Sequence, residues 1–494
     1  MLIGIDIGTT VLKAAAFDPR TGKILAHSSR RLEVETGPDG RREQCPQAVS
    51  RRLTQVLGQL RKQLGTRWKG VTGIGLATQG GSTILAKRTT GEALTPMALW
   101  NDARAFPRFH AIASRKPPSF WRSFSLREEP GMGLARLEQL KQDSPGLIHE
   151  DNIYVGIGEF IYHELAGVWR QDGSNALQIG CYDVRKADLT EKPLKLVGIP
   201  ASFFAPMRRG HETHTLSEHA AKRFGLPEEI PVAGPYGDQE AGFISCMEVS
   251  DSPLQCSLGT AWVGNFIIDH PDSGRSPFQL PIPAPKGGGL LVIQPLLTGN
   301  VTWDWALKAF VDPHEKKALA KQEKIFADAL LPPAGLIAVP WLNRPNPLAP
   351  ELLGGASYVG LSPSTSKEDL LRAIAAGMCY ELARVFGAAA RDKHVDSVVL
   401  TGGASKGIQF QQLVAALFAP APVYHVTEED WVGARGSLYG LNRKAAFSRC
   451  ELVSLRRTVD TDSILAGKKR YVQAFGRLYG SVRAGKAYEF VRRK

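Results

Sequence analysis

The chain opens with an alternation of apolar and polar residues that predicts three consecutive strands. The alternation runs over residues 3–7 and is broken by a Gly-Thr-Thr sequence, after which residues 11–17 predict a second strand. The turn-forming sequence Asp-Pro-Arg-Thr-Gly at 18–22 then leads into residues 23–32, which we predict to return as a third strand. We therefore expect an antiparallel start to the first sheet.

Helical periodicity follows this sheet and returns in the second half of the chain. From Cys45 to Leu64 apolar residues recur every three or four positions, which is typical of a helix with one buried face, and the same spacing returns over 370–386. Short apolar runs at 71–77 and 398–400 predict buried strands. Strands that alternate with helices in both halves favour an α/β protein.

The length of the chain predicts more than one domain. With 494 residues it can bury more than one hydrophobic core. Residues 105–235 mix helix-like stretches with proline-rich turns, and strand signals resume near Leu254. No low-complexity linker separates the halves, so we place the boundary at residue 247, between an N-terminal domain (1–247) and a C-terminal domain (248–494).

Composition excludes several classes of protein. A content of 43% hydrophobic and 22% charged residues is ordinary for a globular chain and argues against a disordered or fibrous one. No window approaches the roughly 18 apolar residues that a membrane-spanning helix needs, and the N-terminus lacks the features of a signal peptide. The six cysteines are scattered singly, which indicates neither a zinc site nor a disulfide framework. We expect a cytoplasmic protein.

The net charge of +13 is concentrated at the C-terminus. Residues 441–494 contain 14 Lys/Arg against 4 Asp/Glu, whereas residues 1–440 are nearly balanced, with 47 against 44. A basic tail can bind nucleic acid or a membrane surface. However, apolar residues recur in it at helical spacing, so we predict a terminal helix with a packing face and a solvated basic side, followed by a solvated terminus at 492–494. The predicted packing face contains Tyr471, Phe475, Leu478, Tyr479 and Val482.

The turn after the first predicted strand has the chemistry of a phosphate site. Gly8 allows backbone N–H groups to approach an anion, and Thr9 and Thr10 add hydroxyl donors. Asp6 could hold a hydrated Mg²⁺ ion, and Lys13 adds positive charge. The alternative is a plain hairpin turn with a solvated aspartate. A Walker-type P-loop is absent from the sequence.

Two further glycine turns follow strand-like runs. Gly259-Thr260 repeats the first Gly-Thr pair 251 residues later, about half the chain length. Either the repeat is a coincidence, or two related lobes each contribute such a turn to a shared cleft. Gly402 and Gly403 follow a buried strand and would allow the backbone to lie flat against a base or ribose, although strand-to-helix connections use the same residues.

Taken in order, these motifs resemble those of the FGGY carbohydrate kinases, which belong to the actin/hexokinase/Hsp70 ATPase superfamily. The resemblance spans about residues 1–440 and includes a C-terminal signature region at 335–361. The matching segments are Asp6-x-Gly8-Thr9-Thr10-x-x-Lys13, Trp100-Asn101-Asp102-Ala103-Arg104, Gly237-Asp238-Gln239-Glu240-Ala241, Ser257-Leu258-Gly259-Thr260, Pro340 with Gly355-Ala356-x-x-x-Gly360-Leu361, and Thr401-Gly402-Gly403-Ala404-Ser405. The family implies an α/β fold of two ribonuclease H-like (actin-like ATPase) lobes with a cleft between them.

The resemblance implies ATP-dependent phosphorylation of a hydroxyl on a ketose or polyol, with a xylulose-like pentulose as the first candidate. Asp238 would be the general base. The implied sugar-binding residues are Gln79, Trp100, Asp102, Arg104 and Gln239. The implied ATP-binding residues are Gly8, Thr9, Thr10, Lys13, Gly259, Thr260, Gly402, Gly403, Ala404 and Ser405. Asp6 and Asp238 would hold Mg²⁺ through water.

Plainer roles compete for several of these residues. Without its neighbouring motifs Asp238 would be taken for a turn or helix-cap residue, and Trp100, which ends an apolar stretch, for a core residue. His211 and His214 are spaced as a metal pair could be, but no third ligand is evident, so a solvated loop is the favoured interpretation.

Two departures from the family pattern leave the substrate open. After Gln79, xylulokinase-like members carry Met-His and glycerol-kinase-like members Arg-Glu, whereas this chain has Gly80-Gly81, which enlarges or reshapes the pocket. Residues 416–423 lack the Asp and Gly of the usual Ala-Asp-x-x-Gly-x-Pro-Val segment, which alters packing near the nucleotide.

These departures motivate an alternative, a non-catalytic protein that senses a sugar or nucleotide on the same scaffold. The basic tail motivates a third hypothesis, nucleic-acid binding, which no helix-turn-helix, zinc-finger or RNP-type signature supports. We expect a small sugar or polyol as partner, no membrane or nucleic acid, and a monomer or homodimer.

Overall fold

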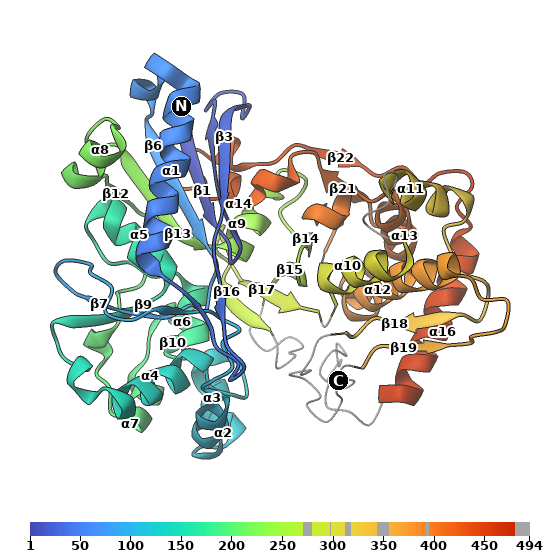
Figure 1. Cartoon of the computed structure of the whole chain (residues 1–494), viewed down its shortest axis with the longest axis horizontal. Coiled ribbons are helices and arrows are strands. Elements are labelled where there is room, and N and C mark those ends of the chain that lie inside the picture. Colours follow the sequence, from blue (N-terminus) through green and yellow to red (C-terminus); the bar gives the residue numbers. More distant parts are fainter. Residues whose placement is uncertain (270–278, 297, 312–317, 343–354, 392–394, 480–494) are drawn as a thin grey trace. The chain divides into compact units, whose positions relative to one another are not determined.

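The computed structural model describes residues 1–269, 279–296, 298–311, 318–342, 355–391 and 395–479. The chain folds into two compact units (Figure 1). The first comprises Met1–Ser245, Leu280–Leu291 and Trp431–Ser448, and the second comprises the remaining described residues. The chain therefore returns twice to the first unit. A single boundary at residue 247 does not describe these two returning segments. That boundary stays a prediction.

The first unit is built on a six-stranded sheet in the order β12-β13-β6-β1-β2-β3. Strand β1 is antiparallel to β2 and parallel to β6, which is in turn parallel to β13. Because β2 is also antiparallel to β3, the predicted antiparallel start is confirmed. The strands are β1 (Leu2–Ile7), β2 (Val11–Phe17), β3 (Ile24–Arg31), β6 (Gly73–Thr78), β12 (Thr213–Thr215) and β13 (Pro231–Gly237).

Strand alternation divides this sheet into an apolar face and a glycine-rich face. Ile3 and Ile5 join the large hydrophobic core beneath the covering helices. Gly4 and Asp6 alternate with them and therefore point to the other face. The apolar face is covered by α1 (Pro46–Leu64), α5 (Ile157–Ala166) and α8 (Glu218–Phe224), and the other face by α9 (Asp238–Ser245) and α14 (Val432–Gly436) (Figure 1).

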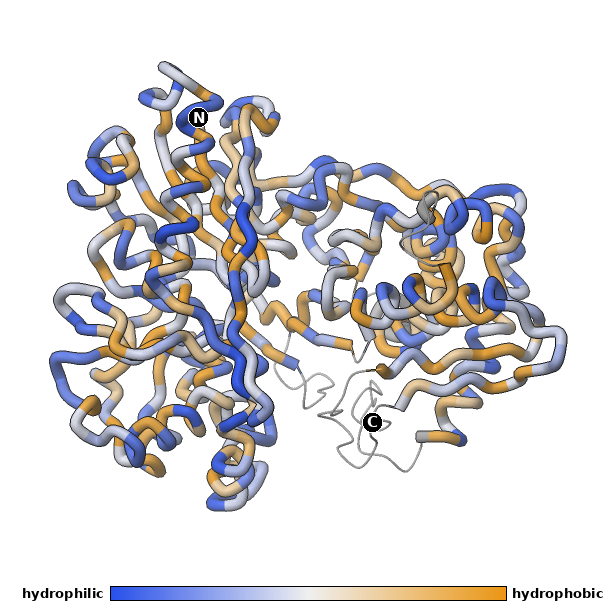
Figure 2. Tube along the Cα trace, viewed as in Figure 1, coloured by the Kyte–Doolittle hydropathy of each residue, from blue (hydrophilic) through white to orange (hydrophobic). Residues whose placement is uncertain are grey.

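The predicted helix of residues 45–64 is α1, and its apolar stripe is buried as expected. Figure 2 shows the contrast between the strands of the sheet, which are largely hydrophobic, and the hydrophilic segment that follows β3 and contains β4 (Glu35–Thr36) and β5 (Arg42–Gln44).

Glycines allow α14 and α9 to approach the sheet and each other closely. A Cβ atom on Gly4 would overlap the carbonyl oxygen of Ala434, and one on Gly75 would overlap that of Ser437. On the helix side, a Cβ atom on Gly436 would overlap the carbonyl oxygen of Ala241 in α9. The backbones thus touch where side chains would normally keep them apart.

The least legible part of the sequence forms a helical layer with its own core in the first unit. This core includes Trp121, Phe124, Leu134 and Tyr154. The helices are α2 (Phe106–Ser114), α3 (Pro118–Ser125), α4 (Met132–Asp143), α6 (Gly173–Ile179) and α7 (Glu191–Val197), and α15 (Arg443–Ala446) also belongs to this unit. The short strands are β7 (Ile84–Lys87), β8 (Met97–Ala98), β9 (Asn152–Val155), β10 (Tyr182–Asp183), β11 (Asp188–Leu189) and β16 (Leu280–Pro283).

The second unit repeats the strand arrangement of the first. Six consecutive strands of a seven-stranded sheet follow the order β17-β15-β14-β20-β21-β22, which corresponds to β3-β2-β1-β6-β13-β12. As in the first unit, β14 is antiparallel to β15 and parallel to β20. The repeat supports two related lobes as the origin of the two Gly-Thr pairs. The strands are β14 (Pro253–Leu258), β15 (Trp262–Ile268), β17 (Leu290–Pro295), β20 (Ser397–Thr401), β21 (Val423–Val426) and β22 (Cys450–Leu452).

Helices and a small sheet complete the second unit. The helices are α10 (Asn300–Phe310), α11 (Ala318–Asp328), α12 (Lys367–Arg391), α13 (Ile408–Phe418) and α16 (Thr461–Tyr479), and the two-stranded sheet pairs β18 (Ile337–Val339) with β19 (Ser357–Val359). The predicted helix of residues 370–386 lies within α12. Residues 416–423 form the end of α13, a connection, and the first residue of β21.

The terminal helix packs through part of its predicted face. Tyr471 is fully buried and donates a hydrogen bond of 2.8 Å to Glu381, and the Phe475 ring contacts that of Trp341. Leu478 is 44% exposed, so the predicted packing face does not extend to it. The predictions for Val482 and for 492–494 fall outside the described residues.

The close contact between α14 and α9 predicts opposite effects for two helical glycine substitutions. Gly436→Ala should lower the free energy of unfolding by about 2 kcal/mol or more, because its Cβ overlaps a backbone oxygen that cannot rotate away. Gly58→Ala on α1, where no atom lies within 4 Å of the added Cβ, should raise it by about 0.5–1 kcal/mol. Urea unfolding of both variants measures the difference, and equal effects would contradict the close packing.

Candidate functional site

The ends of three parallel strands bring together motifs that are distant in the sequence. In the sheet of the first unit Ile7 is paired with Thr78, and Thr78 with Gly237. The residues that follow, including Gln79 and Asp238, therefore emerge at one edge of the sheet. These three segments were predicted separately as a phosphate turn, a sugar contact and a catalytic segment.

Two carboxylates lie close together at this edge. Asp6 is on the α14 face, where a Cβ atom on Gly433 would come within 2.5 Å of its Oδ2 atom. Burial raises the pKa of Asp6 to about 6, and the charge of Lys13, its partner across the β1–β2 ladder, partly opposes this rise. Burial and, to a smaller extent, the negative charge of Asp6 together raise the pKa of Asp238 to about 7.

Asp238 is the first residue of α9 and directly follows β13. Its Oδ1 atom accepts a hydrogen bond of 2.8 Å from the backbone N–H of Gln239, which lowers its pKa less than burial raises it. The sequence offered a helix-cap residue as the plainer alternative. The position at the start of a helix fits a cap, but a carboxylate that keeps its proton near neutral pH fits proton transfer as well.

A single hydroxyl links the phosphate turn to two of the predicted sugar-site residues. Thr9 Oγ1 donates to Gln79 Oε1 at 2.8 Å and accepts from Trp100 Nε1 at 3.3 Å. Gln44 Nε2 donates to the Thr9 carbonyl at 2.8 Å. Trp100 is 48% exposed, so the alternative of a core tryptophan is wrong. The Nε2 atom of Gln79 is buried and has no hydrogen-bond partner within the described residues, which leaves its N–H donors for a ligand.

Asp102 and Arg104 form a supporting network rather than an open contact surface. Asp102 is 2% exposed, and its carboxylate accepts from the Arg42 N–H at 2.9 Å and from Arg104 Nη2 at 2.7 Å. Arg104 also forms an ion pair with Glu43. Desolvation is the largest single influence on the pKa of Asp102 and raises it. The hydrogen bonds from the Arg104 side chain and from the backbone N–H groups of Arg42 and Arg104 together outweigh desolvation and hold the pKa below its usual value. These contacts support a positioning role for both residues.

Arg136 is a positioning residue that the sequence reasoning missed. It lies in α4 and donates to the backbone carbonyls of Gly81 (2.9 Å), Leu99 (2.6 Å) and Trp100 (3.2 Å). It thus connects the segment after Gln79 to the Trp100 segment. The sequence signal for it was a single arginine within the apolar residues 132–137. An arginine is rarely buried unless it is paired.

The second unit brings its own predicted motifs together. Gly402 has a φ of 82°, and a Cβ atom there would lie 2.8 Å from the carbonyl carbon of Leu258. Asn300 holds the same turn, since its N–H donates to the Gly259 carbonyl at 3.0 Å and its Nδ2 to the Leu258 carbonyl at 3.1 Å. The second phosphate motif and the adenosine motif are therefore neighbours. Asn300, at the start of α10, was not predicted.

The remaining predicted residues are placed as follows. Thr10 is exposed at the turn between β1 and β2, and Thr260 is exposed in the corresponding turn of the second unit. Ala404 and Ser405 are buried in a 3₁₀ turn of residues Gly403–Lys406. In the signature region Pro340 follows β18 and Gly360 follows β19, while residues 343–354 lie outside the described part.

The predicted solvated loop around His211 and His214 is wrong. His211 is half-buried, and its ring nitrogens lie 3.0 Å from the Tyr236 hydroxyl and 2.7 Å from the Pro285 carbonyl. His214 lies on β12, and its Nδ1 atom is 3.0 Å from the Tyr162 hydroxyl. Within the described residues no group of three or more His, Cys, Asp or Glu side chains has a metal-binding arrangement.

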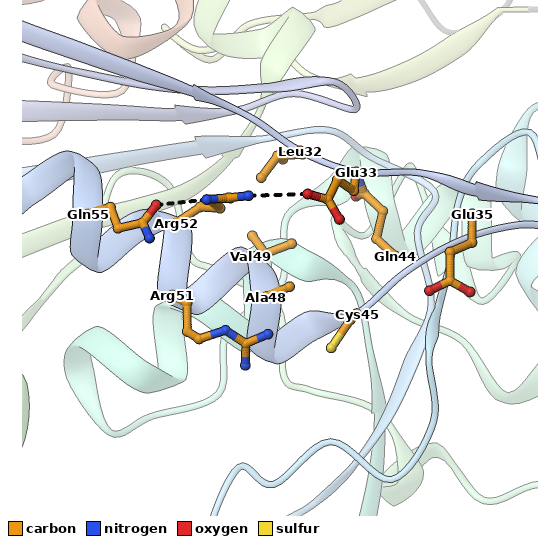
Figure 3. A pocket seen from close by; sticks show the side chains of 10 residues that line it. All are labelled: Leu32, Glu33, Glu35, Gln44, Cys45, Ala48, Val49, Arg51, Arg52 and Gln55. Carbon is orange, nitrogen blue, oxygen red and sulfur yellow. Dashed lines mark hydrogen bonds and ion pairs between the residues drawn. The ribbon is translucent and has the colours of Figure 1, made fainter.

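A separate cavity of about 210 Å³ lies beside the start of α1 in the first unit (Figure 3). An ion pair of 3.2 Å between Arg52 and Glu33 crosses it. Gln44 is the lining residue that also contacts the Thr9 turn, whereas neither Asp6 nor Asp238 lines the cavity. None of the helices described is long and apolar enough to cross a membrane.

Comparison with known protein families identifies the family whose motifs the sequence resembles. Residues 1–245 match the N-terminal domain of the FGGY family of carbohydrate kinases, and residues 256–440 match its C-terminal domain. The chain belongs to this family. FGGY sugar kinases are ATP-dependent phosphotransferases, so ATP is the co-substrate and a small sugar-like molecule is the acceptor.

Individual relatives are distant and differ in substrate. Glycerol kinase 5 from Homo sapiens is 23% identical over 451 residues, which cover 84% of this chain and 82% of that protein. Gluconokinase from Bacillus subtilis (strain 168) is 23% identical over 436 residues, with the same coverage of 84% and 82%. The crystal structure of xylulose kinase from Rhodospirillum rubrum has a TM-score of 0.83 at 18% identity and covers 97% of this chain and 99% of that chain. This likeness confirms the predicted actin-like ATPase fold.

The raised pKa of Asp238 predicts a pH-dependent cost in stability. Between about pH 4 and pH 7 this carboxyl ionises in the unfolded chain and keeps its proton in the folded protein, so stability falls as the pH rises. Asp238→Asn removes this cost. In EDTA at pH 8 the variant should unfold at a higher temperature than the wild type. Its free energy of unfolding should be larger by at most about 4 kcal/mol, and this difference should vanish near pH 4.

Thermal unfolding followed by circular dichroism at both pH values measures this effect. Asp143→Asn, at the exposed end of α4, is the matched control and should change neither curve. An Asp238→Asn variant less stable than the wild type at pH 8 would contradict the raised pKa of Asp238.

Proposed function

We propose that the protein transfers the γ-phosphoryl group of ATP to a hydroxyl of a ketose or polyol, with a xylulose-like pentulose as the first candidate and Asp238 as the general base. The observation that carries the proposal is the pair Asp238 and Asp6 at the meeting point of three strand ends, with the pKa of Asp238 raised to about 7. A general base is most effective when its pKa lies near the working pH.

The proposed step uses Asp238 to orient the acceptor hydroxyl and take its proton. As the new O–P bond forms at the acceptor, the bond between the γ-phosphorus and the bridging oxygen of ADP breaks. The proton passes to the Asp238 carboxylate and later to solvent. The helix start and the hydrogen bond from Gln239 fix the direction in which the carboxylate points.

The two carboxylates fit a divalent cation. Each is partly buried, and the charge of Asp6 opposes ionisation of Asp238, a repulsion that a bound cation relieves. Mg²⁺ prefers few protein carboxylates and keeps several waters, which agrees with two aspartates rather than a larger cluster. Asp6 and Asp238 would hold Mg²⁺ through water. When bound, Mg²⁺ supplies charge neutralisation to the phosphates.

The sugar site is proposed around the exposed ring of Trp100. Aromatic rings stack on the apolar faces of sugars, and Gln79 offers an unengaged Nε2 donor next to it. Gln239 follows Asp238 and adds a further amide. Asp102 and Arg104 hold the Trp100 segment in place, so their contribution is to position that ring.

Nucleotide-binding residues are proposed in each unit separately. In the first unit Gly8, Thr9, Thr10 and Lys13 supply backbone, hydroxyl and ammonium donors for phosphate. The second unit offers a surface of small residues for the remainder of ATP, formed by Gly259, Thr260, Gly402, Gly403, Ala404 and Ser405. We further propose that the protein is a cytoplasmic monomer or homodimer, an environment in keeping with six free cysteines.

The competing hypothesis is a sensor that binds a sugar or nucleotide without catalysis. Gly80-Gly81 and the altered 416–423 segment favour it, because both change residues near the substrates. The retained Asp6–Asp238 pair argues against it, since bringing two like charges together where they are partly desolvated is costly and a sensor gains nothing from it.

Substitution of Asp238 separates the two hypotheses. With ATP and Mg²⁺, the wild type should release ADP in the presence of at least one acceptor among xylulose, ribulose, xylitol, glycerol and gluconate. Asp238→Asn should lower kcat at least about 100-fold, because the proton has no acceptor. Asp143→Asn should retain full activity. Full turnover by Asp238→Asn would contradict the mechanism. If the wild type releases no ADP with any acceptor, the sensor hypothesis is favoured.

The glycine turn of the second unit predicts a defect limited to the nucleotide. Gly402→Ala places a Cβ against the Leu258 carbonyl at a positive φ, so the KM for ATP should rise at least about tenfold while the KM for the acceptor stays within about threefold. Gly476→Ala on α16, where the added Cβ meets no atom within 4 Å, is the control. An unchanged KM for ATP in a stably folded Gly402→Ala enzyme would exclude this turn from the nucleotide site.

A further inference from the structure

A side chain from another element fills the space beside the glycine pair that follows Gln79. A Cβ atom on Gly80 would lie 2.6 Å from Nε2 of Gln178, and a Cβ atom on Gly81 would overlap Oε1 of the same residue. The Gln178 amide therefore lies across both glycines. The pair reshapes the pocket and does not simply enlarge it, because Gln178 occupies the volume that side chains at 80 and 81 would take.

The backbone around this contact is fixed from several sides. The Gly81 N–H donates to Asn175 Oδ1 at 2.9 Å, which ties the glycine pair to α6, the helix that carries Gln178. The Gly81 carbonyl accepts from Arg136 at 2.9 Å. Close to the end of α6, a Cβ atom on Gly131 would overlap the Gln178 carbonyl oxygen. Gln178 is thus held in register with the glycine pair.

The helix also sets the separation between Gln178 and the proposed base. Ser174 and Gln178 are four residues apart on α6 and therefore share a face. A Cβ atom on Gly237, directly before Asp238, would overlap the Ser174 hydroxyl. Since four residues of helix rise about 6 Å, Gln178 stands one helical turn farther along than the residue that touches the Asp238 segment.

The chemistry of the Gln178 side chain suits a neutral hydroxyl-rich ligand. A primary amide offers a donor and an acceptor and carries no charge. The side chain is partly exposed, and within the described part of the chain no hydrogen bond of its amide is found. A ligand hydroxyl could use both functions of the amide at once.

We propose that Gln178 is the specificity-determining residue of the acceptor site, where its amide binds a hydroxyl at the far end of the acceptor. This inference rests on the proposed kinase function. It assigns the acceptor to the neutral polyhydroxy class, a ketose or polyol of at least five carbons, which is long enough to reach from Asp238 to Gln178. Glycerol is too short to reach both residues.

Steady-state kinetics of Gln178→Ala test the proposal. The variant should raise the KM for the best five-carbon acceptor about tenfold, the loss expected for one hydrogen bond between neutral groups. Its kcat should stay within about threefold and the KM values for ATP and glycerol should not change. Gln59→Ala on α1 is the matched control and should behave as the wild type. Equal effects on pentulose and glycerol, a preserved preference in Gln178→Ala, or gluconate as the best wild-type acceptor would overturn the proposal.

A double-mutant cycle tests the contact itself. Gly80→Ala adds a methyl group next to Gln178 Nε2 and should raise the KM for the five-carbon acceptor about tenfold by displacing the amide. In the Gln178→Ala background the same substitution should have little further effect. Additive effects of the two substitutions would contradict the shared space.

Calorimetric binding of the same acceptors without ATP distinguishes failure of this inference from failure of the proposed function. If the wild type is active but Gln178→Ala binds pentulose as tightly, only the role of Gln178 is wrong. If acceptors bind and lose affinity about tenfold in Gln178→Ala, yet none is phosphorylated, the role of Gln178 in binding the polyhydroxy ligand stands and the kinase function is wrong. If no acceptor binds or reacts, both proposals fall.

Discussion

Two partly buried carboxylates at one edge of the sheet, Asp6 and Asp238, whose charges influence each other, are the constraint around which the first unit is arranged. Their burial depends on glycines: Gly433 leaves room for Asp6, and Gly436 lets α14 rest against α9. Larger residues there would lift the helices off the sheet and hydrate the acids. The raised pKa values are therefore a consequence of backbone packing.

The same packing explains why the site is assembled at strand ends. The residues after β1, β6 and β13 leave the sheet at one edge, so the proposed phosphate turn, an amide and the proposed base converge although each comes from a different part of the chain. Side chains with little direct exposure then fix the outer wall. Arg136 holds the Gly81 and Trp100 segments together, and Asp102 anchors the loop that carries Trp100.

The sequence was most informative where local pattern and tertiary role coincide. The alternation of the first strands and the stripe of α1 predicted those elements closely, and the ordered motifs predicted the actin-like fold. The helical layer of residues 105–235 was illegible because its core is assembled from short helices whose partners are distant in sequence. Gln178 and Arg136 were missed for a related reason, since their roles arise from contacts with glycines and carbonyls that have no sequence signature of their own.

The hydroxyl of Thr9 belongs to the phosphate turn, yet it also serves Gln79 and Trp100. A hydroxyl can donate only one hydrogen bond. If a phosphate oxygen accepts the hydrogen bond of Thr9, Gln79 Oε1 becomes available for another partner. Binding of a phosphate at the proposed phosphate turn and the hydrogen bonding of Gln79 and Trp100 in the proposed sugar site are therefore thermodynamically linked. By reciprocity, whatever the first ligand does to the affinity for the second, the second does equally to the affinity for the first. The order in which the two ligands bind therefore does not change the total binding free energy. The presence of each ligand, however, changes the affinity for the other through this one shared proton.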